Sequence, residues 1–228
     1  MAMYEAVRVG ERSTPSRIAS TAAAFGFDGI VYLEDIPLPT CEEISETFGI
    51  DVARGIDIPV EDRDHTGRAI LAARDEYDVL VARTRDESLQ RYLAQRERLD
   101  VLAPGGPIKH TIGKEATAHG IAIEIDLGAV LRTSGADRAR AFRDLRRLAH
   151  VIDTFDLSYV VTGSPSSHLK VRAPRELAAL EPYVRLPDGG IDTGLENWQA
   201  IVSRARQARD DRFIEPGVRR VDNESDDR

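Results

Sequence analysis

The sequence predicts a single-domain α/β protein that folds as a closed (β/α) TIM-like barrel. Seven short β-like runs recur along the 228 residues, and a helix-like stretch follows each run. Strands that alternate with helices in this way are parallel, because a parallel neighbour cannot be reached through a tight turn. A weaker eighth run at Tyr183–Leu186 would complete the barrel, a fold that takes about 250 residues. Functional residues are therefore expected at the strand C-termini and in the loops that follow them.

The predicted strands are short and rich in aliphatic residues. They are Tyr4–Val9, Gly29–Glu34, Val52–Ile58, Val79–Arg83, Asp100–Ala103, Ile121–Leu127 and Tyr159–Gly163. Between them, helix starts are marked by capping residues. Thr14-Pro15 opens the first helix, and Thr40–Glu43 and Thr193–Glu196 have the Thr-x-x-Glu spacing of capping boxes. The longest helix is predicted over 137–155 from its apolar stripe. The buried face of the last helix is predicted to contain Leu195, Trp198, Ile201, Val202 and Ala205.

Residues 1–216 are assigned to the barrel domain, and residues 217–228 to an acidic disordered tail. The hydrophobic content of 42% is sufficient for one barrel core. The last eight residues hold four acidic residues and a single aliphatic one, which is too little apolar surface to offset the entropy of ordering the chain.

The charge balance is acidic, with a net charge of −8 and a pI near 5.2. Lysine is nearly absent, because Lys109, Lys114 and Lys170 are the only three among 31 basic residues. We interpret this composition as adaptation to high salt; the alternative is a G+C-rich genome, which favours Arg codons. An acidic balance does not exclude a nucleic-acid partner, since a local basic patch is what binds phosphate.

Cysteine and hydropathy patterns point to a soluble cytoplasmic protein that does not contact a membrane. Cys41 is the only cysteine, which excludes an internal disulfide and a cysteine-based zinc site. The sequence shows no signal peptide and no apolar run long enough to span a bilayer.

The sixth predicted strand places two carboxylates inside the barrel. Its period-two alternation puts Glu124 and Asp126 on the face opposite the isoleucines, and the same alternation on the first strand turns Arg8 inward. Buried charges need partners, so Arg8 is predicted to pair with Glu124 or Asp126. The three residues could form an acid/base site or a structural ion-paired plug, and structural ion pairs are the commoner source of such patterns.

Basic and hydroxyl-bearing residues gather in the segments that follow the fourth, fifth and seventh strands. They are Arg83 and Arg85; Lys109, His110 and Lys114; and Ser164, His168, Lys170 and Arg172. Parallel strands bring these segments to one barrel end, so we expect a surface there that contacts phosphate, RNA or a partner. A further stripe, Arg140, Arg143 and Arg147, is interpreted as a solvated helix face braced by pairs such as Arg140–Asp144.

Motifs for metal or nucleophilic catalysis are not found. The five histidines, His65, His110, His119, His150 and His168, have no H-x-H or H-x-x-x-H spacing, and no G-x-S-x-G or phosphate-loop motif occurs. We therefore predict no catalytic residue and no metal site on this chain. A metal-assisted phosphoesterase that uses Glu124, Asp126 and His110 is the alternative, and a protein–protein scaffold is a third possibility.

Five motifs, in order along the chain, resemble one family. They are Tyr4–Val7, Asp78–Thr84, Ile108–His110, Ile121–Leu127, and Thr162–Ser164 followed by Leu169–Leu177. Together they resemble the archaeal ribonuclease P protein component three, the homologue of the thirty-kilodalton subunit of eukaryotic nuclear ribonuclease P. The resemblance covers most of the chain from Met3 to about Ala208.

The resemblance implies a barrel related to the polymerase and histidinol-phosphatase phosphoesterases, without their metal-binding histidines. It implies a subunit of the enzyme that removes 5′ leaders from precursor tRNA, in which the RNA subunit holds the divalent metal and performs the hydrolysis. The expected partners are that RNA, precursor tRNA through the complex, and a small ferredoxin-like protein subunit. The polar residues that match the family are Arg83, Lys109, His110 and Ser164. No cofactor is expected on this chain, and the isolated chain is predicted to be inactive.

Overall fold

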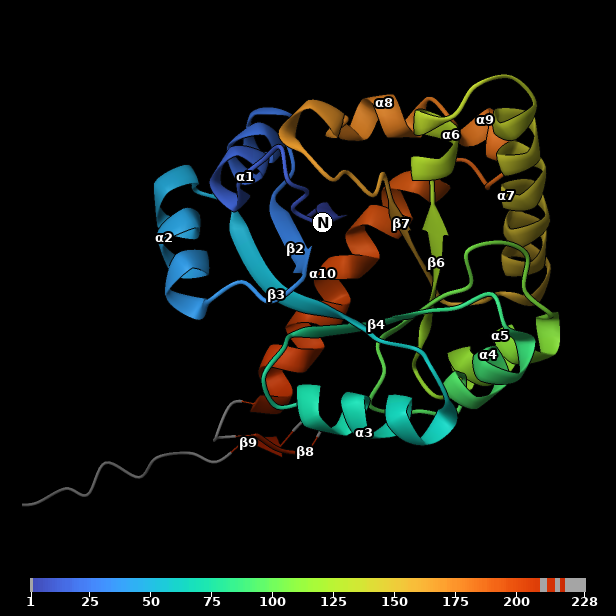
Figure 1. The fold of residues 1–228 in the computed structure, drawn as a ribbon, viewed down its shortest axis with the longest axis horizontal. Helices are drawn as coiled ribbons and strands as arrows, with labels where there is room; N and C mark the ends of the chain where they lie inside the picture. The colour runs from blue at the N-terminus through green and yellow to red at the C-terminus, as the bar shows by residue number, and fades with distance from the viewer. Residues whose placement is uncertain (1, 210–212, 216–217, 220–228) are drawn as a thin grey trace, which may run out of the picture.

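The computed structural model describes residues 2–209, 213–215 and 218–219. Seven parallel strands form one sheet in the order of the sequence, which curls into a nearly closed TIM-like barrel (Figure 1). The strands are β1 (Tyr4–Val7), β2 (Gly29–Leu33), β3 (Asp51–Ile58), β4 (Val79–Arg83), β5 (Val101–Ala103), β6 (Ala122–Asp126) and β7 (Tyr159–Thr162). All seven predicted strands are confirmed, each within a few residues of its expected bounds.

Helices follow the strands, and all but the last cover the outside of the barrel (Figure 1). They are α1 (Pro15–Ala24), α2 (Leu38–Phe48), α3 (Arg63–Ala73), α4 (Glu87–Leu93), α5 (His110–Ala118), α6 (Gly128–Arg132), α7 (Gly135–Phe155), the 3₁₀ turn η1 (His168–Lys170), α8 (Pro174–Ala178), α9 (Glu181–Val184) and α10 (Gly190–Arg209). In the described part of the chain, none of these helices has the length and apolarity that crossing a membrane requires.

The capping predictions have mixed outcomes. Thr14 caps α1 as expected, and its side chain accepts a hydrogen bond from the backbone N–H of Arg17 at 3.3 Å. The two predicted capping boxes are wrong, because Thr40 lies inside α2, which begins at Leu38, and Thr193 lies inside α10. Pro37 precedes α2 and a proline lies in its first turn, where no N–H partner is needed.

The chain end forms a small antiparallel ribbon of β8 (Phe213–Glu215) and β9 (Val218–Arg219). Residues 218–219 of the predicted tail lie in β9. The rest of that predicted tail lies outside the described residues.

The predicted eighth strand at Tyr183–Leu186 is wrong. Residues 181–184 form α9, with Pro182 in its first turn and Arg185 in the left-handed conformation (φ 62°) at its end. Proline at the start of a helix has a favourable φ and no N–H to satisfy, so it favours α9 over a strand. Among the described strands no ladder joins β7 to β1, and a gap is left between them.

The helix α10 covers this gap in place of an eighth strand. Trp198 donates a hydrogen bond from Nε1 to the carbonyl of Val161, and Asn197 donates from Nδ2 to the carbonyl of Tyr159, both at 2.8 Å. These contacts satisfy carbonyls on the open edge of β7. Trp198 also packs with Ile201 and Val202 against the inner face of the strands. The centre of the barrel is thus filled by α10, which crosses the middle of the molecule in Figure 1.

Replacing Trp198 by Phe should destabilise the protein by about 1–3 kcal/mol, the cost of a buried carbonyl without a donor. Phe retains most of the aromatic volume, so the loss reports the hydrogen bond to Val161 more than a cavity. Urea unfolding of the two proteins measures the difference. An unchanged midpoint at an unchanged m-value would contradict the role of Trp198 in closing the β7 edge.

Glu5 crosses the same gap on the side of β1. Its carboxylate accepts hydrogen bonds from the Thr162 hydroxyl at 2.6 Å and from the Gly163 N–H at 3.0 Å, and the side chain is completely buried. No cation pairs with it among the described residues, and burial raises its pKa to about 8. Beyond this contact, the backbone of Arg8 and Gly10 donates to the loop that follows β7. These bonds hold the two edge strands together without a regular ladder.

Candidate functional site

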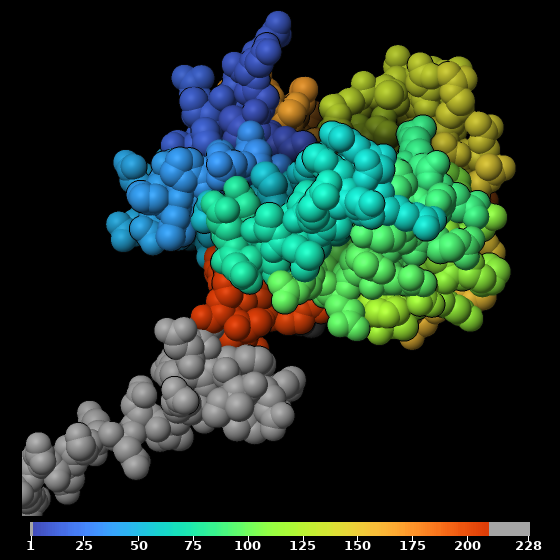
Figure 2. Space-filling view, turned by 60° about the horizontal axis from the view of Figure 1, so that its bottom comes forward, coloured from blue at the N-terminus to red at the C-terminus, as the bar shows by residue number. Residues whose placement is uncertain are grey.

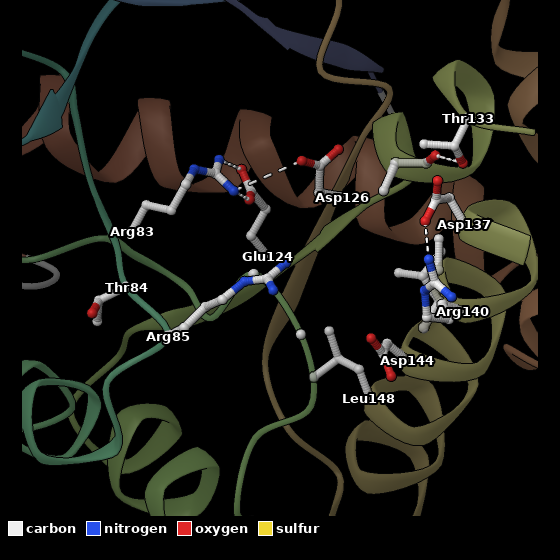
Figure 3. A pocket seen from close by; sticks show the side chains of 15 residues that line it. Arg83, Thr84, Arg85, Glu124, Asp126, Thr133, Asp137, Arg140, Asp144 and Leu148 are labelled. Atoms are coloured by element: carbon white, nitrogen blue, oxygen red, sulfur yellow. Dashed lines mark hydrogen bonds and ion pairs between the residues drawn. The ribbon is translucent and has the colours of Figure 1, made fainter.

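The inner face at the carboxyl ends of the strands carries a group of charges, which we call the mouth cluster: Arg8, Asp57, Arg83, Glu124 and Asp126. Arg83, the last residue of β4, forms a salt bridge with Glu124 on β6, with Nη1 2.7 Å from Oε2, and donates from Nη2 to Oε1 at 3.0 Å. Its Nη1 also lies 3.7 Å from Oδ2 of Asp126. Figure 3 shows Arg83 reaching toward both carboxylates.

Arg8 has a different partner from the one predicted. Its Nε lies 2.5 Å from Oδ2 of Asp57 on β3, and its Nη1 donates to the Ser164 hydroxyl at 3.2 Å. The predicted pairing of Arg8 with Glu124 or Asp126 is therefore corrected to Arg8–Asp57, with Arg83 taking the carboxylates of β6. Arg8 and Asp57 both retain about 30% side-chain exposure, so solvent screens their pair more than that of Glu124.

Burial and charge compensation oppose each other in the electrostatics of the cluster. Burial raises the pKa of Glu124, whose side chain is only 1% exposed, and Arg83 opposes that rise. Burial also disfavours the charged form of Arg83, but the carboxylates of Glu124, Asp126 and Asp57 together outweigh it, and the pKa of the guanidinium is raised. A carboxylate held by a bidentate guanidinium can take up a proton or bind a metal only by weakening a strong charge-assisted pair. The geometry favours the ion-paired plug over an acid/base site.

A cleft of about 740 Å³ opens beside Arg83 and Glu124. It is lined by Arg83, Thr84, Arg85, Gly105, Gly106, Glu124, Asp126, Ala129, Thr133, Asp137, Arg140, Ala141, Asp144, Leu145 and Leu148. Figure 3 shows Arg85 on the wall formed by the loop after β4, and Arg140 and Asp144 on the opposite wall, which is α7. Gly105 has a positive φ (63°), and a Cβ there would lie 3.2 Å from Nε of Arg85, so the glycine lets Arg85 lie across this loop.

The basic residues after the fifth strand do not join the mouth cluster. Lys109 pairs with Glu87 at the start of α4, with Nζ 2.8 Å from Oε2. His110 stacks on Phe155 at the end of α7, with ring centroids 4.6 Å apart, and Lys114 places Nζ 4.7 Å from the same ring. His110 and Lys114 therefore cover an aromatic side chain between α5 and α7.

The basic residues after the seventh strand form a separate group near α1. His168 shares a hydrogen bond with Ser13 at 3.1 Å, and Lys170 donates to Ser166 at 2.9 Å. Arg172 donates to backbone carbonyls of its own segment. Only Ser164 of this group touches the mouth cluster, through Arg8. The contacts of the described residues join none of this group to Lys109, His110 or Lys114, and contact of either group with RNA or a partner stays a prediction.

The phosphoesterase constellation is not assembled in the described residues. His110 lies on Phe155, away from Glu124 and Asp126, and no group of three or more His, Cys, Asp or Glu residues in that part of the chain has the geometry to hold a metal ion. The carboxylates that face the mouth are matched by arginines, which a divalent cation would have to displace. The residues present do not fit a metal centre of the kind that activates water.

Several residues of the site were missed in the sequence. Asp57 lies on the inward face of β3 by the same alternation that identified Glu124, so the pattern of Val52–Ile58 could have revealed it. Gly105-Gly106 and Arg140 line the cleft, but only the tertiary fold brings the loop after β5 and α7 to the same cleft. Thr133 and Asp144 have no sequence signal that we can identify.

The fold and the mouth cluster define a TIM-like barrel whose strand ends are occupied by ion pairs between arginine and carboxylate side chains. The family described as RNase P subunit p30 matches residues 3–210, and the chain belongs to that family. Its relatives include the ribonuclease P protein component 3 of Halobacterium salinarum, which is 39% identical over 98% of this chain and 100% of the relative. The protein of the same name from Haloarcula marismortui is 34% identical over 98% of this chain and 99% of the relative. Both relatives come from haloarchaea, in agreement with the salt-adaptation interpretation.

Solved structures agree on the fold. A chain of an archaeal ribonuclease P determined by cryo-EM with mature tRNA superposes with a TM-score of 0.81 at 18% identity, covering 97% of this chain and 99% of that one. The histidinol phosphate phosphatase of Lactococcus lactis, solved with zinc, has a TM-score of 0.51 at 12% identity, covering 89% and 93%. The predicted relation to the histidinol-phosphatase barrel is confirmed at the level of the fold.

Proposed function

We propose that this chain, as a subunit of ribonuclease P, supports removal of the 5′ leader from precursor tRNA while an RNA subunit performs the hydrolysis. The observation that carries the proposal is the family match over residues 3–210, and the pairing of Arg83 with both Glu124 and Asp126 argues against a catalytic barrel. Those two carboxylates would be the acid, base or metal ligands of an enzyme built on this barrel. With the Arg83 guanidinium beside them, these carboxylates are instead held in ion pairs.

The proposed partners are the ribonuclease P RNA, precursor tRNA through the complex, and a small ferredoxin-like protein subunit. The family membership supports the RNA partner, and the archaeal ribonuclease P that shares this fold was determined with mature tRNA. The divalent metal of the reaction is proposed to be held by the RNA, so this chain would carry no cofactor. The cytoplasm is the proposed compartment.

Reconstitution tests this function. Precursor-tRNA cleavage is measured with the RNA subunit and the remaining protein subunits, in the presence and absence of this chain. We expect cleavage to increase when the chain is added and to require the RNA. Equal cleavage without the chain would overturn the proposal.

The isolated chain provides the matching control. It should not hydrolyse p-nitrophenyl phosphate or precursor tRNA in Mg²⁺, Mn²⁺ or Zn²⁺, because no base or metal-bound water is available to activate the nucleophile. Turnover that is lost in Glu124→Gln, together with one equivalent of bound metal by elemental analysis, would favour the phosphoesterase instead.

A further inference from the structure

The outward face of α7 carries cations and no carboxylate. Its apolar residues Leu145, Leu148, Ala149 and Ile152 are buried against the barrel. At 100° per residue, Arg143, Arg147 and His150 lie on the opposite side of the helix, and Arg140 lies at the edge of that side next to the cleft. We call these four residues the outward face of α7. The three aspartates of the helix lie on its flanks by the same geometry.

The arginines of α7 differ in their contacts. Arg140 pairs with Asp137, Arg138 donates to the carbonyl of Thr133, and Arg146 donates to the carbonyl of Tyr183. Arg143 and Arg147 are exposed and form no ion pair or hydrogen bond with any part of the chain that the structure describes. The predicted bracing pair Arg140–Asp144 is not formed. Two adjacent guanidiniums are thus free to bind a ligand.

These free cations belong to a chain with a net charge of −8, so they are a local exception to its charge balance. They lie one helical turn apart, and the segment that contains α7 is on the molecular surface, at the upper right of Figure 2. The face has no exposed aromatic or large aliphatic side chain, which the centre of a protein–protein interface normally contains. A row of arginines without apolar residues matches the charge and the bidentate geometry of backbone phosphates.

We propose that the outward face of α7, centred on Arg143 and Arg147, binds backbone phosphates of the RNA in the complex. The inference rests on the proposed function, and it assigns the RNA contact to a helix face instead of the basic loops at the strand ends. His150 and Arg140 extend the face along the helix, and Arg140 links it to the cleft beside Arg83. Contacts of this kind position the RNA without reading its sequence.

The test measures binding of the reconstituted protein subunits to the ribonuclease P RNA as a function of KCl concentration. The variant is Arg143→Gln/Arg147→Gln, and the matched control is Arg17→Gln/Arg68→Gln, which removes two exposed arginines from α1 and α3. The slope of log K against log[KCl] is negative, and each lost phosphate contact reduces its magnitude by roughly 0.7–0.9. We expect the α7 variant to reduce that magnitude by about 1.4–1.8 and to weaken binding at low salt about tenfold or more, while the control retains the wild-type slope.

A slope for the α7 variant equal to that of the control would overturn the inference. So would a loss of binding to the protein subunits without RNA, measured by native mass spectrometry, because it would identify an acidic protein surface as the ligand. Wild-type cleavage activity separates the two proposals: if the wild-type chain fails to stimulate cleavage, the proposed function itself is wrong. Melting temperatures of both variants should equal that of the wild type, since the side chains are exposed.

Discussion

Replacing Arg83 by Met should destabilise the protein by about 3–5 kcal/mol at neutral pH, the typical cost of removing one partner from a buried ion pair. The sequence alone suggests that Arg83 is a solvated loop charge, and replacing such a charge would cost less than about 0.5 kcal/mol of stability. The structure places it over Glu124, whose side chain is almost fully buried and would be left with an uncompensated charge. Chemical denaturation at fixed salt measures the change in the free energy of unfolding.

The double variant Arg83→Met/Glu124→Gln is the control. It removes both charges, so it should recover most of the stability that the single variant loses. The pH dependence gives a second check with a defined sign. Without Arg83 the pKa of Glu124 rises further above its unfolded value, so the folded variant gains stability by binding a proton. The deficit relative to wild type should shrink as the pH falls toward 5 and grow as it rises. A small deficit that does not change with pH would contradict the pairing.

The alternation of β6 predicted two inward carboxylates, and the structure has them on that face. Their cation could not be deduced in the same way. Arg8, one residue after β1, and Arg83, the last residue of β4, both face inward by the alternation of their strands. Which of the two arginines pairs with Glu124 depends on which strands face each other across the barrel. Strand register and barrel curvature decide which strands face each other, and neither can be deduced from a local sequence pattern. Asp57 is a different case. The alternation of β3 predicts that its side chain faces inward, but it was not identified as a site residue.

The last helix, α10, shows what the hydrophobic periodicity of a helix can and cannot predict. The predicted buried face of α10, including Trp198 and Ile201, is buried in the structure. Its location inside a gap between β7 and β1 was not predictable, because an amphipathic stripe indicates that a helix is covered but not what covers it. The weak run at Tyr183–Leu186 suggested an eighth strand where the chain instead turns through α9. Side chains of a helix therefore close the barrel, and the number of strands in the sequence could not predict this closure.

The basic segments illustrate the same limit for the site. Parallel strands do bring the loops that follow them to one end of the barrel. A loop of several residues can nevertheless extend away from that end before it reaches its charged residues. His110 and Lys114 lie on α5, where Phe155 provides a surface for them, and Lys109 pairs with Glu87. Arg83 belongs to the last position of a strand and points inward. Arg83 and Ser164 touch the mouth cluster, whereas the contacts of Lys109, His110 and Lys114 lie outside it.

Replacing Glu5 by Gln should stabilise the protein at alkaline pH and leave its stability nearly unchanged near pH 4.5. Burial raises the pKa of Glu5 to about 8, against an unfolded value of 4.5. The folded state therefore binds a proton that the unfolded state releases between these values. The stability that this proton provides is complete below pH 4.5 and is lost as the pH rises through 8. At about 1.4 kcal/mol per pH unit, the wild type should lose roughly 3–5 kcal/mol relative to the variant over that range.

Gln keeps the side-chain shape and the acceptor oxygen that receives the Thr162 hydroxyl and the Gly163 N–H, so it removes the charge without opening the gap between β1 and β7. The free energy of unfolding of both proteins is measured from pH 4.5 to 9 at constant ionic strength. Glu5→Ala provides the control, because it removes the charge and the acceptor together and should be less stable than Glu5→Gln at every pH. Parallel curves for the wild type and Glu5→Gln would show that Glu5 ionises normally in the folded state, and that the seam between the edge strands admits solvent.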